Sequence, residues 1–364
     1  MVTYFLLFCF SFLEVRYPLS DGLKRGFYIV TYLIIVLQIG LRWETGTDWV
    51  PYLTHFENID TFASTSPLVT GMEYGYSVLC WLVKIFSNDY SVLLIVHSLI
   101  YYWIVFKGIQ LFSPYFFICV LLFYAFTMGV MGSHRQLIAI SIILYSCKFI
   151  IHKNPYKFFF CIILATLFHT TAIICIPLYF LDRRFNTYGL IVVIMMAVVL
   201  GKTAIPITAF NLLGRIGGIG DKVLVYLEGG LDAAKDYSVS TVGLVKRILF
   251  VLIFLYARER LSTKLIHYNL ILNAYIVGIL LYFLFSSSLT ILVSRGSLYF
   301  NMFEPILLSS LLLLFEFEKD RVVILMFFFL LSVLYFFQSI AQYADLFLPY
   351  KGLFINSDYI RELK

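Results

Sequence analysis

The chain has 364 residues, of which 61% are hydrophobic and only 13% are charged, and its mean hydropathy is +0.91. A soluble domain of this length needs far more charge on its surface, so these values exclude a sizeable soluble domain and predict a surface that is largely in contact with lipid. The net charge of +6 does not indicate a nucleic-acid partner, because Lys and Arg of membrane proteins gather in cytoplasmic loops and can bind anionic headgroups.

Long apolar runs recur along the whole sequence. About 20 apolar residues in a helix span a bilayer, and these runs lack the alternation that transmembrane β-strands show. We therefore predict an all-α, polytopic integral membrane protein with about 10–12 transmembrane helices, in which residues 1–364 form a single transmembrane domain. The candidate spans are 2–15, 26–41, 90–107, 114–131, 136–151, 157–180, 188–209, 242–257, 265–290, 297–315 and 322–341.

The first run, Val2 to Leu13, lacks a basic segment before it and an A-x-A cleavage site after it. It is interpreted as a retained first helix rather than a signal peptide. The six cysteines all lie within apolar segments and form no C-x-x-C pair, so we expect small buried hydrophobic residues rather than disulfides or zinc ligands.

Lys and Arg set the predicted orientation. Each of four basic clusters lies between predicted spans or flanks the turn that joins two of them, and one topology places all four in the cytoplasm. The periplasmic loops are then 42–73 and 210–241, with a periplasmic C-terminal tail at 342–364. The clusters are Arg16, Lys24 and Arg25; Lys148, Lys153 and Lys157; Arg258, Arg260 and Lys264; and Lys319 with Arg321.

Two segments strain this topology. The run Tyr74–Phe86 is too short to span comfortably. A single helix between Lys157 and the pair Arg183–Arg184 would place these cations on opposite sides, so the chain must break between residues 155 and 210. The break falls either near His169-Thr170-Thr171 or near Gly201 to Pro206, and the sequence leaves both open.

The loop 42–73 is the richest polar segment. Arg42 and Glu44 follow the second predicted span, Asp48 follows a glycine, and Glu73 closes the loop. Arg42 could be a helix-end residue that reaches for the interface, and Glu73 a favourable charge at a helix N-terminus. The gathering of Arg, Glu and Asp beside a glycine turn favours a functional interpretation.

Two further groups lie between or within apolar runs. Arg135 is suited to bind phosphate oxygens through two parallel N–H groups, and it falls on the side where the orientation rule does not require a cation. His169 lies inside the run Phe158–Phe180, where an ionisable group is costly and usually functional, although a satisfied core histidine is the alternative. Histidine is also the natural proton acceptor near neutral pH.

The later polar segments supply more cations and aromatic residues. The glycine-rich loop 210–241 is interpreted as a lid or substrate clamp, with a simple linker as the alternative. The residues of interest in these segments are Arg215, Tyr226, Arg295, Tyr299 and Lys351.

Other signatures are weak or missing. His55 to Asp60 matches the H-x4-D pattern of glycerolipid acyltransferases, but this short pattern arises often by chance and has no accompanying phosphate-binding motif. No H-E-x-x-H, D-x-D or paired-His motif is present, so we expect neither a metal nor a cofactor.

The polar segments together resemble the EpsG-like family, the Wzy-type polymerases of bacterial O-antigen and capsular polysaccharide. The resemblance extends from about residue 40 to 310, and its motifs keep the family's order between the apolar runs. They are Arg42…Gly46-Thr47-Asp48-Trp49…Tyr52, Glu73-Tyr74-Gly75-Tyr76, Arg135-Gln136-Leu137-Ile138-Ala139, Phe168-His169-Thr170-Thr171-Ala172-Ile173 and Arg295…Tyr299-Phe300.

The resemblance implies a glycosyltransferase of the bacterial inner membrane whose active site faces the periplasm, and a helix arrangement of the GT-C type is compatible with it. Donor and acceptor would be oligosaccharide repeat units on undecaprenyl pyrophosphate, which leaves after transfer. The implied partners are these lipids, the bilayer and a chain-length regulator protein, with no nucleic acid. A flippase or transporter of the same lipid, an O-antigen ligase and an acyltransferase that decorates the glycan are the rival functions.

This chemistry assigns roles to the polar residues. The reaction needs cations aimed at the leaving pyrophosphate and a base for the acceptor hydroxyl. His169, Asp48 and Glu73 compete as the base. The expected catalytic residues are Arg42, Asp48, Glu73, Arg135, His169 and Arg295, and the expected substrate contacts are Glu44, Gln136, Arg215, Tyr226, Tyr299 and Lys351.

Overall fold

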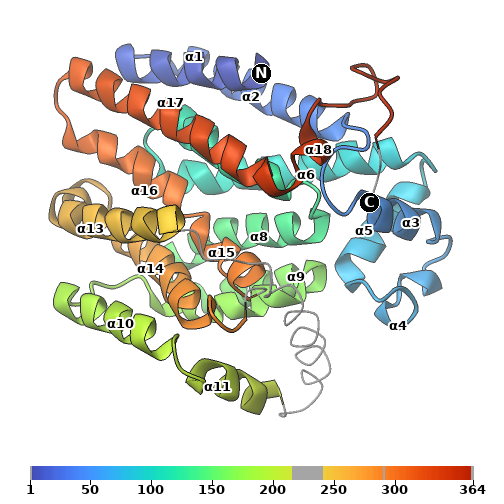
Figure 1. The fold of residues 1–364 in the computed structure, drawn as a ribbon. Coiled ribbons are helices and arrows are strands. Elements are labelled where there is room, and N and C mark those ends of the chain that lie inside the picture. The colour runs from blue at the N-terminus through green and yellow to red at the C-terminus, as the bar shows by residue number, and fades with distance from the viewer. Residues whose placement is uncertain (1, 215–240, 290–291, 362–364) are drawn as a thin grey trace. The chain divides into compact units, whose positions relative to one another are not determined.

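The computed structural model describes residues 2–214, 241–289 and 292–361, and these residues form helices and no β-strand (Figure 1). The prediction of an all-α polytopic membrane protein is confirmed by six described helical segments that are long and apolar enough to cross a membrane. They are Asp21–Gly40, Tyr90–Phe112, His134–Ile151, Tyr268–Phe285, Leu292–Leu314 and Glu318–Phe347. Four shorter apolar segments cover Phe116–Val130, Pro155–Phe168, Thr170–Phe180 and Thr187–Leu200.

The contacts divide the chain into two compact units, of which unit 1 comprises Met1–Ile173 and Leu308–Lys364. Its centre is α8 (His134–Ile151), which packs against α6 (Tyr90–Phe112) and α9 (Pro155–Phe168) and is buried over most of its length. Because α8 carries charged residues only in its first turn and at Lys148 in its last turn, neighbouring helices can surround its middle.

The remaining long helices of unit 1 pack around this centre. Helix α2 (Asp21–Gly40) packs against α6, while α1 (Val2–Arg16), α7 (Phe116–Thr127) and α17 (Glu318–Ile340) contact one another (Figure 1). Helices α1, α2 and α17 expose large apolar side chains, as lipid-facing helices do, whereas α7 is mostly buried. Examples on α2 and α17 are Ile29, Leu33, Leu37, Phe327, Leu330 and Leu334.

Unit 2 comprises Ile174–Leu307 and is built around α14 (Tyr268–Phe285). This helix has twelve buried residues and contacts α10, α11, α13, the π-helix η4 and α15. The bounds of these elements are Thr187–Leu200 for α10, Ile205–Gly214 for α11, Thr241–Lys264 for α13, Leu292–Gly296 for η4 and Leu298–Asn301 for α15.

Both of the alternative chain breaks predicted between residues 155 and 210 occur. Helix α9 ends at Phe168, because His169 takes an extended backbone (φ −154°, ψ 117°), and the chain continues as a 3-10 helix, η3 (Thr170–Phe180). Threonine and histidine side chains offer the backbone alternative hydrogen-bond partners, which favours a helix end here. The second break lies between α10 and α11, where Pro206 occupies the first turn of α11, the one place where a helix tolerates it well.

The short elements lie mainly between α2 and α6. Helix α5 (Tyr74–Lys84) has eleven residues and is roughly 16 Å long, which agrees with the expectation that this run is too short to span. The others are α3 (Trp49–Glu57), η1 (Ala63–Thr65) and α4 (Pro67–Thr70), and elsewhere η2 (Met128–Val130), α16 (Glu304–Ser310), η5 (Leu311–Leu314), η6 (Ala341–Tyr343) and α18 (Ala344–Phe347).

One close backbone approach fixes the loop after α2 against the turn before α8. A Cβ added to Gly132 would lie 1.9 Å from the carbonyl oxygen of Thr47 and 2.9 Å from its nitrogen. No side chain fits there, so this glycine allows the segment after Arg42 to meet the N-terminus of α8.

We therefore expect Gly132→Ala to lower the stability of the folded protein by about 1–3 kcal/mol, because backbone atoms must move to admit the methyl group. Gly26→Ala is the control, since a Cβ at Gly26 meets nothing within 4 Å and alanine favours a helix. The measurement is the thermal unfolding midpoint of each purified variant in the same detergent. Equal midpoints for the two variants would contradict the close approach.

Candidate active site

Several polar residues gather at one end of unit 1, where α2 ends, α5 and α8 begin, and the chain breaks after α9. Five of them are linked in series by hydrogen bonds or by electrostatic interaction and are called the Arg135 cluster: Tyr52, Glu73, Arg135, His169 and Thr170. Four of the sequence-predicted catalytic residues, Asp48, Glu73, Arg135 and His169, lie in this cluster or on the adjoining loop. Arg42 is buried and reaches the cluster through His134, on whose ring Tyr52 stacks.

Arg42 is completely buried and contacts no solvent. Its guanidinium donates to the carbonyl oxygens of Ile39 (2.6 Å) and Met131 (3.3 Å) and to Nε2 of His134. Arginine has no acceptor atom, so His134 accepts through Nε2 and carries its proton on Nδ1, which faces the Tyr76 hydroxyl at 3.1 Å.

No carboxylate of the described chain pairs with Arg42. Burial lowers the pKa of its guanidinium, and the neighbouring tyrosines, Tyr90 foremost, counter this in part. An arginine keeps its charge even so, which makes the fixed carbonyl and imidazole dipoles its compensation. Arg42 therefore holds the ends of α2 and α8 together.

The loop after Arg42 makes a tight turn that is joined to the C-terminal tail. Glu44 and Asp48 have left-handed φ values of 45° and 58°. Lys351 accepts a hydrogen bond from the backbone N–H of Trp43 (3.0 Å), and its ammonium donates to Glu44 (2.5 Å). Two predicted substrate contacts, Glu44 and Lys351, thus neutralise each other, and only 7% of Lys351 is exposed.

Asp48 is the acid of this loop that faces outward. Its side chain is exposed, and it accepts only a long hydrogen bond, at 3.5 Å, from the hydroxyl of Ser133. It lies one residue beyond Thr47, the residue whose carbonyl rests on Gly132.

Arg135 is a half-buried cation in the first turn of α8. Its Nε donates to the Tyr52 hydroxyl (3.1 Å), Nη1 donates to Glu73, and the guanidinium lies over the Tyr52 ring at 5.6 Å. Its side chain is 20% exposed and that of Glu73 12%. Nη2 has no partner among the residues that the structure describes, which leaves one edge of the guanidinium open.

Glu73 connects Arg135 to the break after α9. One carboxylate oxygen accepts from Arg135, and the other accepts from the backbone N–H (3.2 Å) and the hydroxyl (3.0 Å) of Thr170. Gly75 permits this, because a Cβ there would lie 2.8 Å from the carbonyl oxygen of Leu167. Partial burial raises the pKa of Glu73, but Arg135, His169 and the Thr170 N–H outweigh it, so the pKa lies below its ordinary value of 4.5.

His169 caps the C-terminus of α9 and is only 3% exposed. Its Nδ1 lies 2.6 Å from the hydroxyl of Thr171. The ring is near enough to Glu73 to help lower the pKa of that carboxyl. The apolar run around His169 in the sequence therefore ends at a polar junction.

An aromatic layer of Tyr52, Tyr76 and His134 supports the cluster. The ring of Tyr52 stacks on His134 (centroids 4.7 Å apart, 23°) and meets Tyr76 edge-on at 5.2 Å. Both tyrosines and His134 stand within or beside the motifs around Asp48, Glu73 and Arg135, at positions one to four residues away. Their closeness in sequence to these charged residues is the feature by which the sequence could have predicted their place beside the cluster.

The acyltransferase-like pattern does not form a site of its own. His55 contacts the Ser77 hydroxyl at 3.2 Å, whereas Asp60 pairs with Lys84 at 3.0 Å. Burial and the nearby Arg135 lower the pKa of His55 to about 4, so it is neutral at physiological pH.

Three other predicted residues belong to α8 and to unit 2, and two lie outside the description. Gln136 is buried in α8. Arg295, in η4, and the buried Tyr299, in α15, belong to unit 2. Arg215 and Tyr226 lie outside the described residues. Within the described residues, no three His, Cys, Asp or Glu side chains gather so as to hold a metal ion.

Comparison with known proteins gives one result. The family model of the EpsG family matches residues 26–352. This range includes Arg42, Asp48, the Arg135 cluster and Lys351. No curated protein and no solved structure matches the chain.

The lowered pKa of Glu73 predicts a pH dependence of stability. A carboxyl with a depressed folded pKa contributes stability above its unfolded pKa, 4.5, and loses it as the pH falls through the folded value. Glu73→Gln should therefore unfold at a lower temperature than the wild type at pH 7. The difference between their midpoints should shrink as the pH falls below 4.5. A difference that stays constant down to pH 3 would show that the charge of Glu73 is not stabilising.

Proposed function

Because the chain belongs to the EpsG family, which supports a role like that of a polysaccharide polymerase, we propose that it is a membrane glycosyltransferase that polymerises oligosaccharide repeat units. In this proposal the units are carried on undecaprenyl pyrophosphate, and they are joined at the periplasmic face of the bacterial inner membrane. The product is O-antigen or capsular polysaccharide, and undecaprenyl pyrophosphate leaves.

The observation that carries the proposal is the geometry of Arg135. Tyr52 and Glu73 hold two of its nitrogens, while Nη2, in a partly exposed side chain, has no partner within the described residues. A guanidinium held in this way is ready to bind a phosphate oxygen, and it needs little reorganisation as charge develops on the leaving group. Glu73 orients the cation without neutralising its open edge.

The reaction transfers the growing glycan from its pyrophosphate to a hydroxyl of the acceptor unit. The bond between the anomeric carbon and the pyrophosphate oxygen breaks, and the electron pair leaves with the pyrophosphate. The acceptor oxygen forms the new bond and must lose its proton. Because pyrophosphate is a good leaving group, the principal demands on the protein are a fixed cation and a base.

The contacts of the cluster rank the three candidate bases. Glu73 is the weakest, because Arg135 and Thr170 occupy its oxygens and lower its pKa. His169 stands at the polar junction, where the contact of Nδ1 with Thr171 orients the imidazole, and histidine is the usual proton acceptor near neutral pH. We assign the base to His169, with the exposed Asp48 as the alternative.

The buried residues have a different task in this proposal. Arg42 joins the end of α2 to the first turn of α8 through its hydrogen bonds. We therefore assign it as a positioning residue rather than a phosphate ligand. Glu44 and Lys351 act in the same way, through the loop and the tail, whereas a substrate role for the buried Gln136 stays a prediction. Substrate roles for Arg295, Tyr299, Arg215 and Tyr226 stay predictions from the family motifs and the sequence pattern.

Deletion of the gene tests the proposed reaction. We expect the surface polysaccharide ladder to disappear while material with a single repeat unit persists, because polymerisation alone is lost. Gel electrophoresis of the extracted polysaccharide is the measurement. Acceptor without any repeat unit would identify a ligase or flippase instead, and an intact ladder of altered mass would identify a decorating enzyme.

Complementation with Arg135→Lys tests the site in the same strain. Lysine keeps the charge but cannot bind Tyr52, Glu73 and phosphate together, so we expect roughly a 100-fold loss of polymerisation rate. Arg16→Lys is the matched control, because Arg16 pairs with Glu318 on an exposed surface. Equal activity of the two variants at equal protein levels would exclude the proposed role of Arg135.

The identity of the base is tested by the pH dependence of turnover on purified lipid-linked repeat units. With His169 as base, wild-type kcat should rise with pH as the imidazole loses its proton, and His169→Gln should lose both activity and this rise. Asp48→Asn should retain the rise. The reverse pattern, with Asp48→Asn inactive and His169→Gln still dependent on pH, would assign the base to Asp48.

A further inference from the structure

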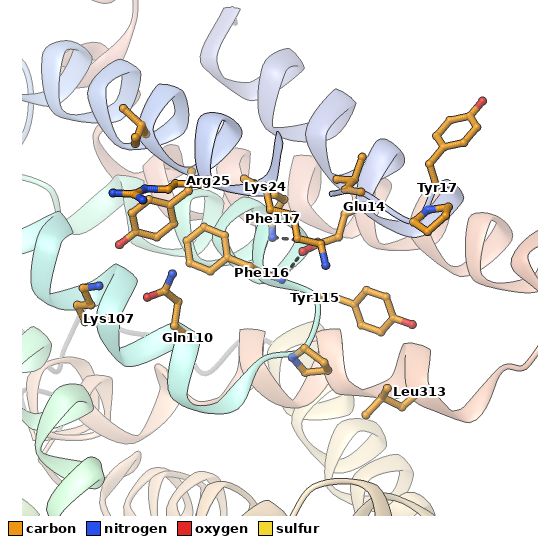
Figure 2. Close-up of a pocket in the computed structure, with 15 residues that line it drawn as sticks. Glu14, Tyr17, Lys24, Arg25, Lys107, Gln110, Tyr115, Phe116, Phe117 and Leu313 are labelled. Carbon is orange, nitrogen blue, oxygen red and sulfur yellow. Dashed lines mark hydrogen bonds between the residues drawn. The ribbon is translucent and has the colours of Figure 1, made fainter. Parts of the chain in front are cut away.

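A second polar feature lies at the end of α2 opposite Arg42. A cavity of about 890 Å³ opens there between α1, α2, α6 and the start of α7, all within unit 1 (Figure 2). Since α2 has 20 residues, roughly 30 Å of helix separates this cavity from the Arg135 cluster. The two features therefore face opposite sides of a bilayer.

Three cations from two helices surround the cavity. Lys24 and Arg25 come from the first turns of α2, and Lys107 comes from the last turns of α6, on which Gln110 follows (Figure 2). All three cations are exposed, and none forms a salt bridge within the described part of the chain.

The one carboxylate in the lining is already engaged. The oxygens of Glu14 accept the backbone N–H groups of Phe116 (2.8 Å) and Phe117 (3.0 Å) at the start of α7 (Figure 2). It therefore forms no ion pair with the cations, and an excess of positive charge is left at the cavity.

The rest of the lining is apolar and continues along α2. Ile29, in the lining, is 46% exposed, and Leu33 and Leu37 follow on the same helix face at 48% and 52%. Residues four apart on a helix form one stripe. The cationic cavity thus opens beside an apolar stripe of the kind that faces lipid tails.

We propose that this cavity binds the phosphate headgroup of an anionic membrane lipid, whose acyl chains lie along the Ile29–Leu37 stripe. Its volume is more than large enough to admit a phosphate with its glycerol. Cations that only set the orientation of the chain need neither a cavity nor convergence from separate helices. A water-soluble phosphate would leave the apolar stripe uncovered.

The test is lipid binding to the full-length protein in a neutral detergent, with phosphatidylglycerol and phosphatidylcholine titrated in parallel and bound lipid counted by native mass spectrometry. We expect phosphatidylglycerol to bind more tightly. The triple variant Lys24→Gln, Arg25→Gln, Lys107→Gln should bind it about 100-fold more weakly, or roughly fivefold for each charge removed.

Two further variants keep the test decisive. Gln110→Glu leaves the cations in place but adds a negative charge that repels the phosphate, and should weaken lipid binding by about fivefold. The triple variant Lys148→Gln, Lys153→Gln, Lys157→Gln removes the same charge from α8, α9 and the turn between them, none of which lines the cavity, and should leave binding unchanged.

Three results would overturn the proposal. Phosphatidylcholine could bind as tightly as phosphatidylglycerol, or the two triple variants could weaken binding equally, and either would remove the case for a specific headgroup site. Soluble glycerol phosphate could bind as tightly as the lipid, which would exclude the acyl stripe from the site.

Discussion

A buried guanidinium without a carboxylate underlies the candidate active site. Arg42 must satisfy its charge with fixed dipoles, and it finds them at the end of α2, in the turn before α8 and on His134. That contact fixes the His134 ring, on which Tyr52 stacks, and Tyr52 in turn accepts a hydrogen bond from Arg135. Removal of the buried charge would disturb every later contact in this series, although Arg42 itself reaches no solvent.

The Arg135 cluster is built at helix ends, for a physical reason. The interior of a membrane protein has no water to satisfy free N–H and C=O groups, so irregular backbone survives only where side chains or neighbouring elements satisfy it. The break after Phe168 meets this condition, because Glu73 accepts the N–H and the hydroxyl of Thr170. The same contact directs Glu73 toward Arg135. The chain break after Phe168 and the ion pair of Glu73 with Arg135 therefore depend on each other.

The two ends of unit 1 use cations in contrasting ways. At one end, Arg42 and Arg135 are buried or half-buried and held by several partners each. At the other end, Lys24, Arg25 and Lys107 are exposed around a cavity. The nearby Glu14 accepts hydrogen bonds from backbone N–H groups. The first arrangement favours a single geometry, as a transition state requires, and the second favours attraction of a charged lipid surface.

The sequence by itself determined that the chain is a helical membrane protein, since composition and the length of apolar runs report how much surface can face water. It also located the polar segments around Arg42, Glu73, Arg135 and His169, because charge stands out against an apolar background. Only the tertiary structure decided that Arg42 is enclosed, that Lys351 neutralises Glu44, and that both chain breaks occur. The sequence pattern reports local backbone preference and burial on average, whereas these outcomes depend on which distant segments meet. Glu44 and Lys351 are separated by most of the chain, and no periodicity within a helix could have paired them.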